Sequence, residues 1–133
     1  MFENLLTSIG INSLKVDTLV KSEYISPNDS LSGIINLYGG NTTQIVNKIE
    51  LSLIERYDNP DERSQIPVLE NELETLILHK NININKEEQR SEEFKFNLPE
   101  VSFKRNQDYL ILKTRVYIAN SVDAYDEDKI FFK

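Results

Sequence analysis

The chain has 133 residues, with 22 acidic against 15 basic side chains and a formal net charge of −7. This length fits one domain with a sizeable core, and 39% hydrophobic with 28% charged residues is typical of a soluble globular protein. Because nucleic-acid phosphates repel an acidic protein, the charge argues against a nucleic-acid partner. The absence of cysteine excludes disulfides, thiolate nucleophiles and zinc sites built on cysteine.

The chain begins with a short amphipathic segment. Its apolar residues recur at the spacing of one helical face and predict a helix of about two turns. These residues are Phe2, Leu5, Leu6 and Ile9. Since so short a helix is marginal in water, its apolar face must dock on this domain or a missing neighbour, or bind a partner or a membrane surface. The lack of Lys and Arg argues against the membrane surface. No secretory signal and no membrane-spanning run are present in the sequence.

Beyond this segment, apolar and polar residues alternate in runs that end at turn residues. Alternation places successive side chains on opposite faces of a sheet, so each run can bury one face. The predicted strands cover residues 14–20, 24–25, 31–38, 43–57, 72–84, 94–98, 110–118 and 129–132. Such closely spaced strands predict a single all-β domain over residues 1–133, an antiparallel β-sandwich of about eight strands.

The region at residues 66–84 is the least clear in this pattern. Leu69, Leu73 and Leu76 have helical spacing, whereas Leu76, Leu78, Ile82 and Ile84 favour an extended chain, and the prediction is one long strand. Residues 86–90 are predicted as a charged connector, and residues 119–128 as a turn.

Few residues suggest chemistry. His79 is the only histidine, and it fits an outward-facing strand residue better than a catalytic base or metal ligand. The acidic stretch at 123–128 lacks EF-hand spacing, so a solvated turn is favoured over a cation site. Three glutamates share one strand face, which is interpreted as a solvent-exposed surface or as a sheet edge protected against strand addition. They are Glu70, Glu72 and Glu74. No catalytic, cofactor-binding or metal-binding residue is predicted, and no enzymatic activity.

Several stretches resemble one bacterial family. They are Ser8-Ile9-Gly10-Ile11 through Lys15-Val16-Asp17-Thr18, then Tyr24, Pro27 and Leu31-Ser32-Gly33-Ile34-Ile35 followed by Gly39-Gly40, then Ile49-Glu50-Leu51-Ser52-Leu53-Ile54-Glu55-Arg56-Tyr57, Phe94-Lys95-Phe96-Asn97-Leu98-Pro99-Glu100, Leu112-Lys113-Thr114 and Ala119-Asn120-Ser121-Val122-Asp123-Ala124. In order and spacing they resemble the sporulation-control (SpoOM) family. The chain departs from its pattern at Ala124, where Pro is usual, and at Glu3-Asn4, where Lys is common.

The resemblance implies an arrestin-like, immunoglobulin-like β-sandwich that is the first of two domains in the family. It also implies a non-enzymatic, cytoplasmic regulatory or scaffolding role without a cofactor. It supplies no catalytic residues.

The first functional hypothesis is therefore a domain that recognises protein partners. Its candidate contacts are the face formed by Phe2, Leu5, Leu6 and Ile9, and a strand edge at Val16, Thr18 and Val20. An exposed edge can add a partner's strand, and it also offers a route to a homo-oligomer. The alternatives are an extracellular ligand-binding or adhesin-type sandwich, and a carbohydrate-active enzyme with two carboxylates facing each other across a cleft.

Overall fold

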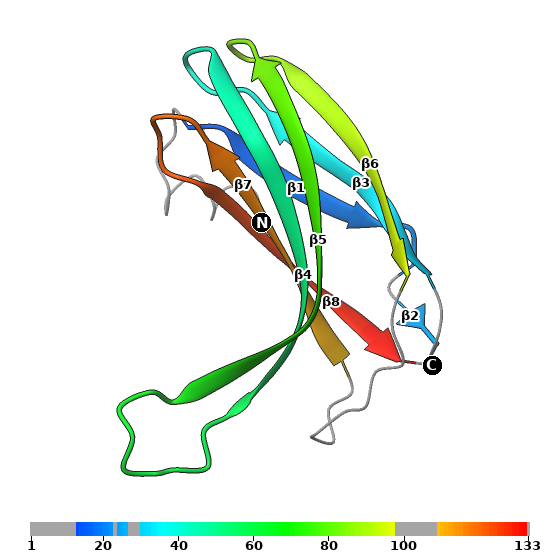
Figure 1. Ribbon diagram of the computed structural model, residues 1–133, viewed down its shortest axis with the longest axis vertical. Coiled ribbons are helices and arrows are strands. Elements are labelled where there is room, and N and C mark those ends of the chain that lie inside the picture. The colour runs from blue at the N-terminus through cyan, green and yellow to red at the C-terminus, as the bar shows by residue number, and fades with distance from the viewer. Residues whose placement is uncertain (1–12, 23, 27–29, 98–108, 133) are drawn as a thin grey trace.

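The computed structural model describes residues 13–22, 24–26, 30–97 and 109–132, and this part of the chain consists of strands and their connections (Figure 1). The strands are β1 Lys15–Val20, β2 Tyr24–Ile25, β3 Ser30–Tyr38, β4 Gln44–Asp58, β5 Val68–Ile84, β6 Gln89–Asn97, β7 Tyr109–Ile118 and β8 Ala124–Phe132. The all-β prediction is confirmed. The helix expected at residues 2–9 lies outside the described residues.

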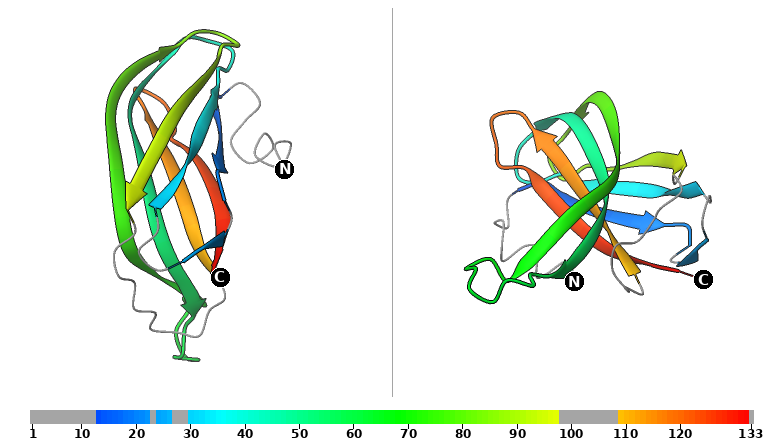
Figure 2. Two further views of the ribbon diagram at one scale, coloured as in Figure 1. Left: turned by 90° about the vertical axis from the view of Figure 1, so that its right-hand side faces the viewer. Right: turned by 60° about the horizontal axis from the view of Figure 1, so that its bottom comes forward.

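The strands form two sheets that pack against each other as layers (Figure 2). The three-stranded sheet has the order β1-β3-β6, and the five-stranded sheet has the order β2-β8-β7-β4-β5. The pairings between described strands are antiparallel, except that β2 runs parallel to the end of β8 for two residues. The predicted antiparallel β-sandwich is confirmed, and the chain crosses from β1 in one layer to β2 in the other.

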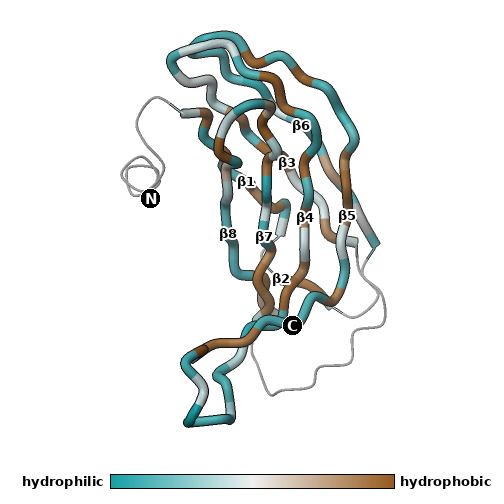
Figure 3. The backbone as a smooth tube through the Cα atoms, turned by 60° about the vertical axis from the view of Figure 1, so that its left-hand side comes forward, coloured by the Kyte–Doolittle hydropathy of each residue, from teal (hydrophilic) through white to brown (hydrophobic). Residues whose placement is uncertain are grey.

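The core lies between the two layers and is built from the inward-facing row of each strand. Fully buried side chains include Leu31, Ile35 and Leu37 on β3, Ile49, Leu51 and Leu53 on β4, and Leu110, Leu112 and Val116 on β7. Hydrophobic and hydrophilic residues are interspersed along these strands (Figure 3). Burial of each aliphatic side chain contributes about 1.5–3 kcal/mol, so this alternation determines which face of each strand turns inward.

Three strands begin earlier than alternation predicts. β5 begins at Val68, β6 at Gln89 and β8 at Ala124, so part of the predicted connector at 86–90 and of the predicted turn at 119–128 is strand. In these segments polar residues occupy both faces of the strand, so the sequence lacks the alternation of apolar and polar residues from which a strand is predicted. The helical spacing on β5 has a different cause. A register shift opposite Leu53/Ile54 leaves Leu73 as an extra residue, so that Leu73 and Leu76 both pack on the core although they are three positions apart.

Gly33 marks a close approach of β3 to β1. A Cβ atom at this position would lie 2.1 Å from the backbone oxygen of Leu19. Because no side chain fits there, glycine is required for β1 to pair with β3 at Val20.

Candidate interaction surface

β1 is an edge strand of the three-stranded sheet, with β3 as its hydrogen-bonded neighbour. Lys21 donates its backbone N–H to Ser32 across this pair. By the alternation of an antiparallel pair, the N–H and C=O groups of Val16, Thr18 and Val20 therefore point away from β3. We call this row of backbone groups the β1 edge. The side chains of the same residues turn inward: Val16 and Thr18 are buried, and Val20 packs on the core.

The middle of the β1 edge is occupied by a carboxylate from the other sheet. Thr18 donates its backbone N–H to Asp126 Oδ2 of β8 at 2.7 Å. Its hydroxyl lies 2.8 Å from the hydroxyl of Thr114 on β7, and both hydroxyls are buried. β1 and β8 thus run close together along one side of the sandwich, joined by polar contacts.

Asp126 belongs to the acidic stretch that the sequence predicted as a solvated turn. It lies within β8 instead, paired with Thr114 and half-buried. Burial raises the pKa of the Asp126 carboxyl, and the charge of Asp17 acts in the same direction, while hydrogen bonds from Thr18 and with Asp128 partly offset the rise. The prediction missed this role because Asp126 and Asp128 lie on the inward face of β8, where a polar residue breaks the apolar pattern.

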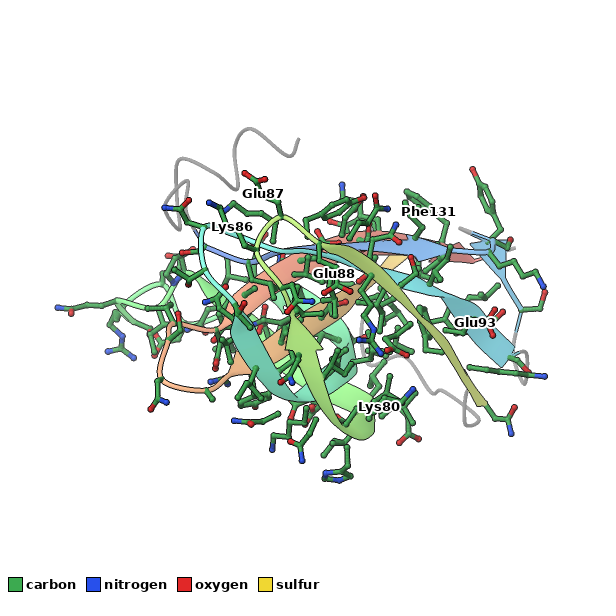
Figure 4. All side chains as sticks on the ribbon, turned by 90° about the horizontal axis from the view of Figure 1, so that it is seen from above. Lys80, Lys86, Glu87, Glu88, Glu93 and Phe131 are labelled. Atoms are coloured by element: carbon green, nitrogen blue, oxygen red, sulfur yellow. The ribbon has the colours of Figure 1, made fainter. Side chains whose placement is uncertain are left out.

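A groove lies across β1, β3 and β6 beside the β1 edge. Its volume is about 730 Å³. Leu19 and Ile34, which pair across β1 and β3, form its apolar part and are 49% and 37% exposed. The remaining outward side chains that line it are Lys21, Ser32, Glu93 and Lys95. Glu93, labelled on β6 in Figure 4, pairs with Ile34. We call this surface the Leu19 groove; the sequence signal for it was an apolar Leu19 in the otherwise charged row of Lys15 and Asp17.

The outer face of the five-stranded sheet carries mixed charge. Arg56 on β4 bonds Glu70 on β5 at 2.6 Å and Glu127 on β8 at 2.8 Å. The hydrogen bond from Arg56 lowers the pKa of Glu127. In turn, the hydrogen bonds with Glu127 and Glu70 raise the pKa of Arg56. Arg115 bonds Asp123 at 2.8 Å. A smaller hollow of about 350 Å³ lies between these groups. Since both arginines already have carboxylate partners, this face favours structural ion pairs over capture of an anion.

The remaining candidates do not assemble into a reactive centre within the described part of the chain. His79 is exposed on β5, opposite Lys48. Among the described residues, no group of three or more His, Cys, Asp or Glu side chains is placed to hold a metal ion. Glu55 is fully buried on β4, and neither of its carboxyl oxygens has a hydrogen-bond partner among the described residues. Phe2, Leu5, Leu6 and Ile9 lie outside the described residues.

Comparison with known proteins identifies relatives along nearly the full chain. The sequence pattern of the SpoOM protein family matches residues 2–133. The sporulation-control protein spo0M of Bacillus subtilis is 25% identical over 135 residues, which covers 98% of this chain and 50% of the relative. The crystal structure of Spo0M from Bacillus subtilis superposes with a TM-score of 0.79 at 24% identity, covering 92% of this chain and 50% of that one. This match confirms the predicted arrestin-like sandwich.

More distant structures share only the architecture. The alkylpurine DNA glycosylase AlkC of Pseudomonas fluorescens matches with a TM-score of 0.50 at 10% identity, covering 93% of this chain and 31% of the glycosylase. Our chain spans about half the length of the Bacillus relative it matches. The described residues contain no helix with the length and hydrophobicity needed to cross a membrane.

Proposed function

Since the chain belongs to the SpoOM family, whose curated relative is a sporulation-control protein, we propose that it is a cytoplasmic regulatory or scaffolding domain that acts by binding other proteins and not by catalysis. Family membership supports the regulatory role. Protein recognition is our inference from the surface of this domain.

The observation that carries the proposal is the Leu19 groove. Two large aliphatic side chains, Leu19 and Ile34, lie side by side in solvent on a sheet face where alternation would place polar residues. Charged side chains of both signs surround them, including Lys21, Glu93 and Lys95. An apolar centre with a polar rim is the usual anatomy of a protein–protein contact. The groove therefore fits a protein ligand that offers an apolar side chain flanked by charges.

The contacts predicted from sequence remain part of the proposal. The β1 edge at Val16, Thr18 and Val20 borders the Leu19 groove, so a partner seated in the groove would lie next to this edge. The face of Phe2, Leu5, Leu6 and Ile9 is a second proposed contact. Deletion of residues 1–10 should weaken partner capture if that face contributes.

Affinity capture from the native cell tests the groove. The full-length protein, tagged at its own locus, is compared with a Leu19→Glu/Ile34→Glu variant, which places charge in the groove without touching the core. Val122→Glu is the matched control, because Val122 is 76% exposed and lies at the β7–β8 turn, outside the groove.

The proposal expects that one or more proteins are retained by the wild type and by Val122→Glu, and are lost from the groove variant. If all three versions retain the same proteins, the Leu19 groove is not the surface that binds them. Fractionation of the same cells tests the location, since recovery in the envelope or the medium would contradict cytoplasmic action.

A further inference from the structure

The β1 edge has a backbone pattern that can pair with itself. The N–H and C=O groups that point away from β3 belong to Val16, Thr18 and Val20, and among the described strands β1 has its hydrogen-bonded neighbour on the other side. An antiparallel strand added here must present the same alternate pattern. A second copy of β1, related by a twofold axis, presents it.

The outward side chains of β1 select one register. Asp17 and Leu19 of β1, together with Lys21 directly after its end, form a row that faces away from the core, with Leu19 and Lys21 exposed. When Leu19 lies opposite Leu19 of the second copy, Asp17 lies opposite Lys21 on both sides of the axis. Opposite charges that face each other stabilise a strand pair, and like charges destabilise it. In this register Thr18 exchanges backbone hydrogen bonds with Val20 of the second copy, and the two exposed leucines cover each other.

Asp126 stands in the way of this pairing. Its carboxylate takes the Thr18 N–H at 2.7 Å, which is the hydrogen bond that an added strand needs at the centre of the edge. A carboxylate that points at a sheet edge opposes strand addition. It accepts the hydrogen bond of a backbone N–H that an added strand would use, and it places a charge beside the incoming backbone. We call this contact the Asp126 latch.

We propose that β1 is a latent self-association strand, which pairs antiparallel with β1 of a second copy in the Leu19-to-Leu19 register and is held closed by the Asp126 latch. This inference goes beyond the proposed function, because it concerns contact between two copies and requires no other partner. It connects the three-stranded sheets of two molecules into one continuous sheet.

The first test is the mass of the purified chain in sedimentation velocity. Asp126→Ala removes the latch and should shift the mass from 15.5 kDa towards twice that value as concentration rises. Asp126→Asn is the matched control, since its amide oxygen can still accept the Thr18 N–H, and it should stay monomeric like the wild type. In the Asp126→Ala background, Asp17→Lys should abolish the dimer through lysine repulsion. Addition of Lys21→Asp to that variant should restore it.

The second test reads the register and does not depend on a stable dimer. Because the natural chain has no cysteine, Leu19→Cys gives a single thiol that lies opposite its own copy, at a non-hydrogen-bonded position where a cross-strand disulfide fits. With oxidised glutathione as oxidant, Leu19→Cys/Asp126→Ala should cross-link faster than Leu19→Cys alone. Ile34→Cys/Asp126→Ala is the control, since Ile34 is exposed but lies on β3, away from the edge.

A folded Asp126→Ala variant that stays monomeric and cross-links no faster through Leu19→Cys than through Ile34→Cys would overturn the proposal. So would dimers that persist in the Asp17→Lys variant, because they would use another surface. These outcomes leave the proposed function untouched, since the experiments contain no partner protein.

Discussion

The hydroxyl oxygens of Thr18 and Thr114 lie 2.8 Å apart in the interior and join the two sheets. Thr18 belongs to β1 of the three-stranded sheet, and Thr114 to β7 of the five-stranded sheet. Each hydroxyl is shielded from water, so each depends on the other for a hydrogen bond. This pair lies next to the Asp126 latch, since Thr114 pairs with Asp126, and it bridges β1 to β7 of the other sheet.

Replacement of either threonine should lower the free energy of unfolding by more than the loss of one hydrogen bond alone. Thr18→Val or Thr114→Val leaves the other hydroxyl buried without a partner, and we expect a loss of about 1–3 kcal/mol in the free energy of unfolding. The double variant should lose less than the sum of the two, because it leaves no hydroxyl unpaired. Urea unfolding of the four proteins measures this coupling, and strict additivity would show that the two hydroxyls do not depend on each other.

Gly33→Ala should disturb the pairing of β1 with β3. The new methyl group would lie 2.1 Å from the Leu19 oxygen, which is backbone and cannot rotate away. We expect a loss of about 1–3 kcal/mol or more, as for other overpacked sites. Ser32→Ala on the same strand is the control and should be nearly neutral. An unfolding midpoint of Gly33→Ala equal to that of the control would show that β1 can shift without cost.

Glu55→Leu should stabilise the protein. The Glu55 side chain is fully buried, and its two carboxyl oxygens have no hydrogen-bond partner in the part of the chain that the structure describes. Burial of a polar group without compensation costs about 1–3 kcal/mol in proteins, so an aliphatic side chain of similar size should recover part of this cost. Glu62→Leu, at an exposed loop position, is the control for the change in net charge. Lower stability of Glu55→Leu in urea unfolding at neutral pH would indicate that this carboxyl makes a favourable contact in solution.

The ion pairs of Arg56 should make stability depend on acid pH. Arg56 lowers the pKa of Glu127 in the folded protein, so the pair contributes stability above the unfolded glutamate pKa of about 4.3, and this contribution is lost as the pH falls through the folded value. The side chains of the pair are 32% and 42% exposed, and we expect less than about 1 kcal/mol per pair.

Arg56→Met tests this expectation. The difference in unfolding free energy between the wild type and Arg56→Met should be present at pH 7 and should decrease as the pH falls below the unfolded glutamate pKa of about 4.3. Arg63→Met is the control, because the Arg63 side chain is 96% exposed. A difference that stayed constant with pH would mean that Arg56 acts through packing of its aliphatic stem and not through its charge.

Alternation in the sequence determined the architecture wherever one strand face is apolar. Along β4, the alternation of apolar Ile49, Leu51 and Leu53 with polar residues predicted the strand within about one residue at each end. These polar residues are Lys48, Glu50 and Ser52. The same logic failed at the start of β8, where Asp126 and Asp128 occupy inward positions. Asp126 meets the edge strand β1 of the other sheet, and the sequence carries no sign of which strand lies opposite.

The sequence by itself therefore determined the fold class, the order of the strands along the chain, and the likeness to the SpoOM family, because these depend on patterns within each strand. Only the tertiary structure decided which strands become edges and which side chains meet across the two sheets. The contact of Asp126 with Thr18 joins residues 108 positions apart, and the exposure of Leu19 beside Ile34 depends on the pairing of β1 with β3. Such contacts follow from the packing of layers, since residues far apart in the chain become neighbours only when the sheets assemble.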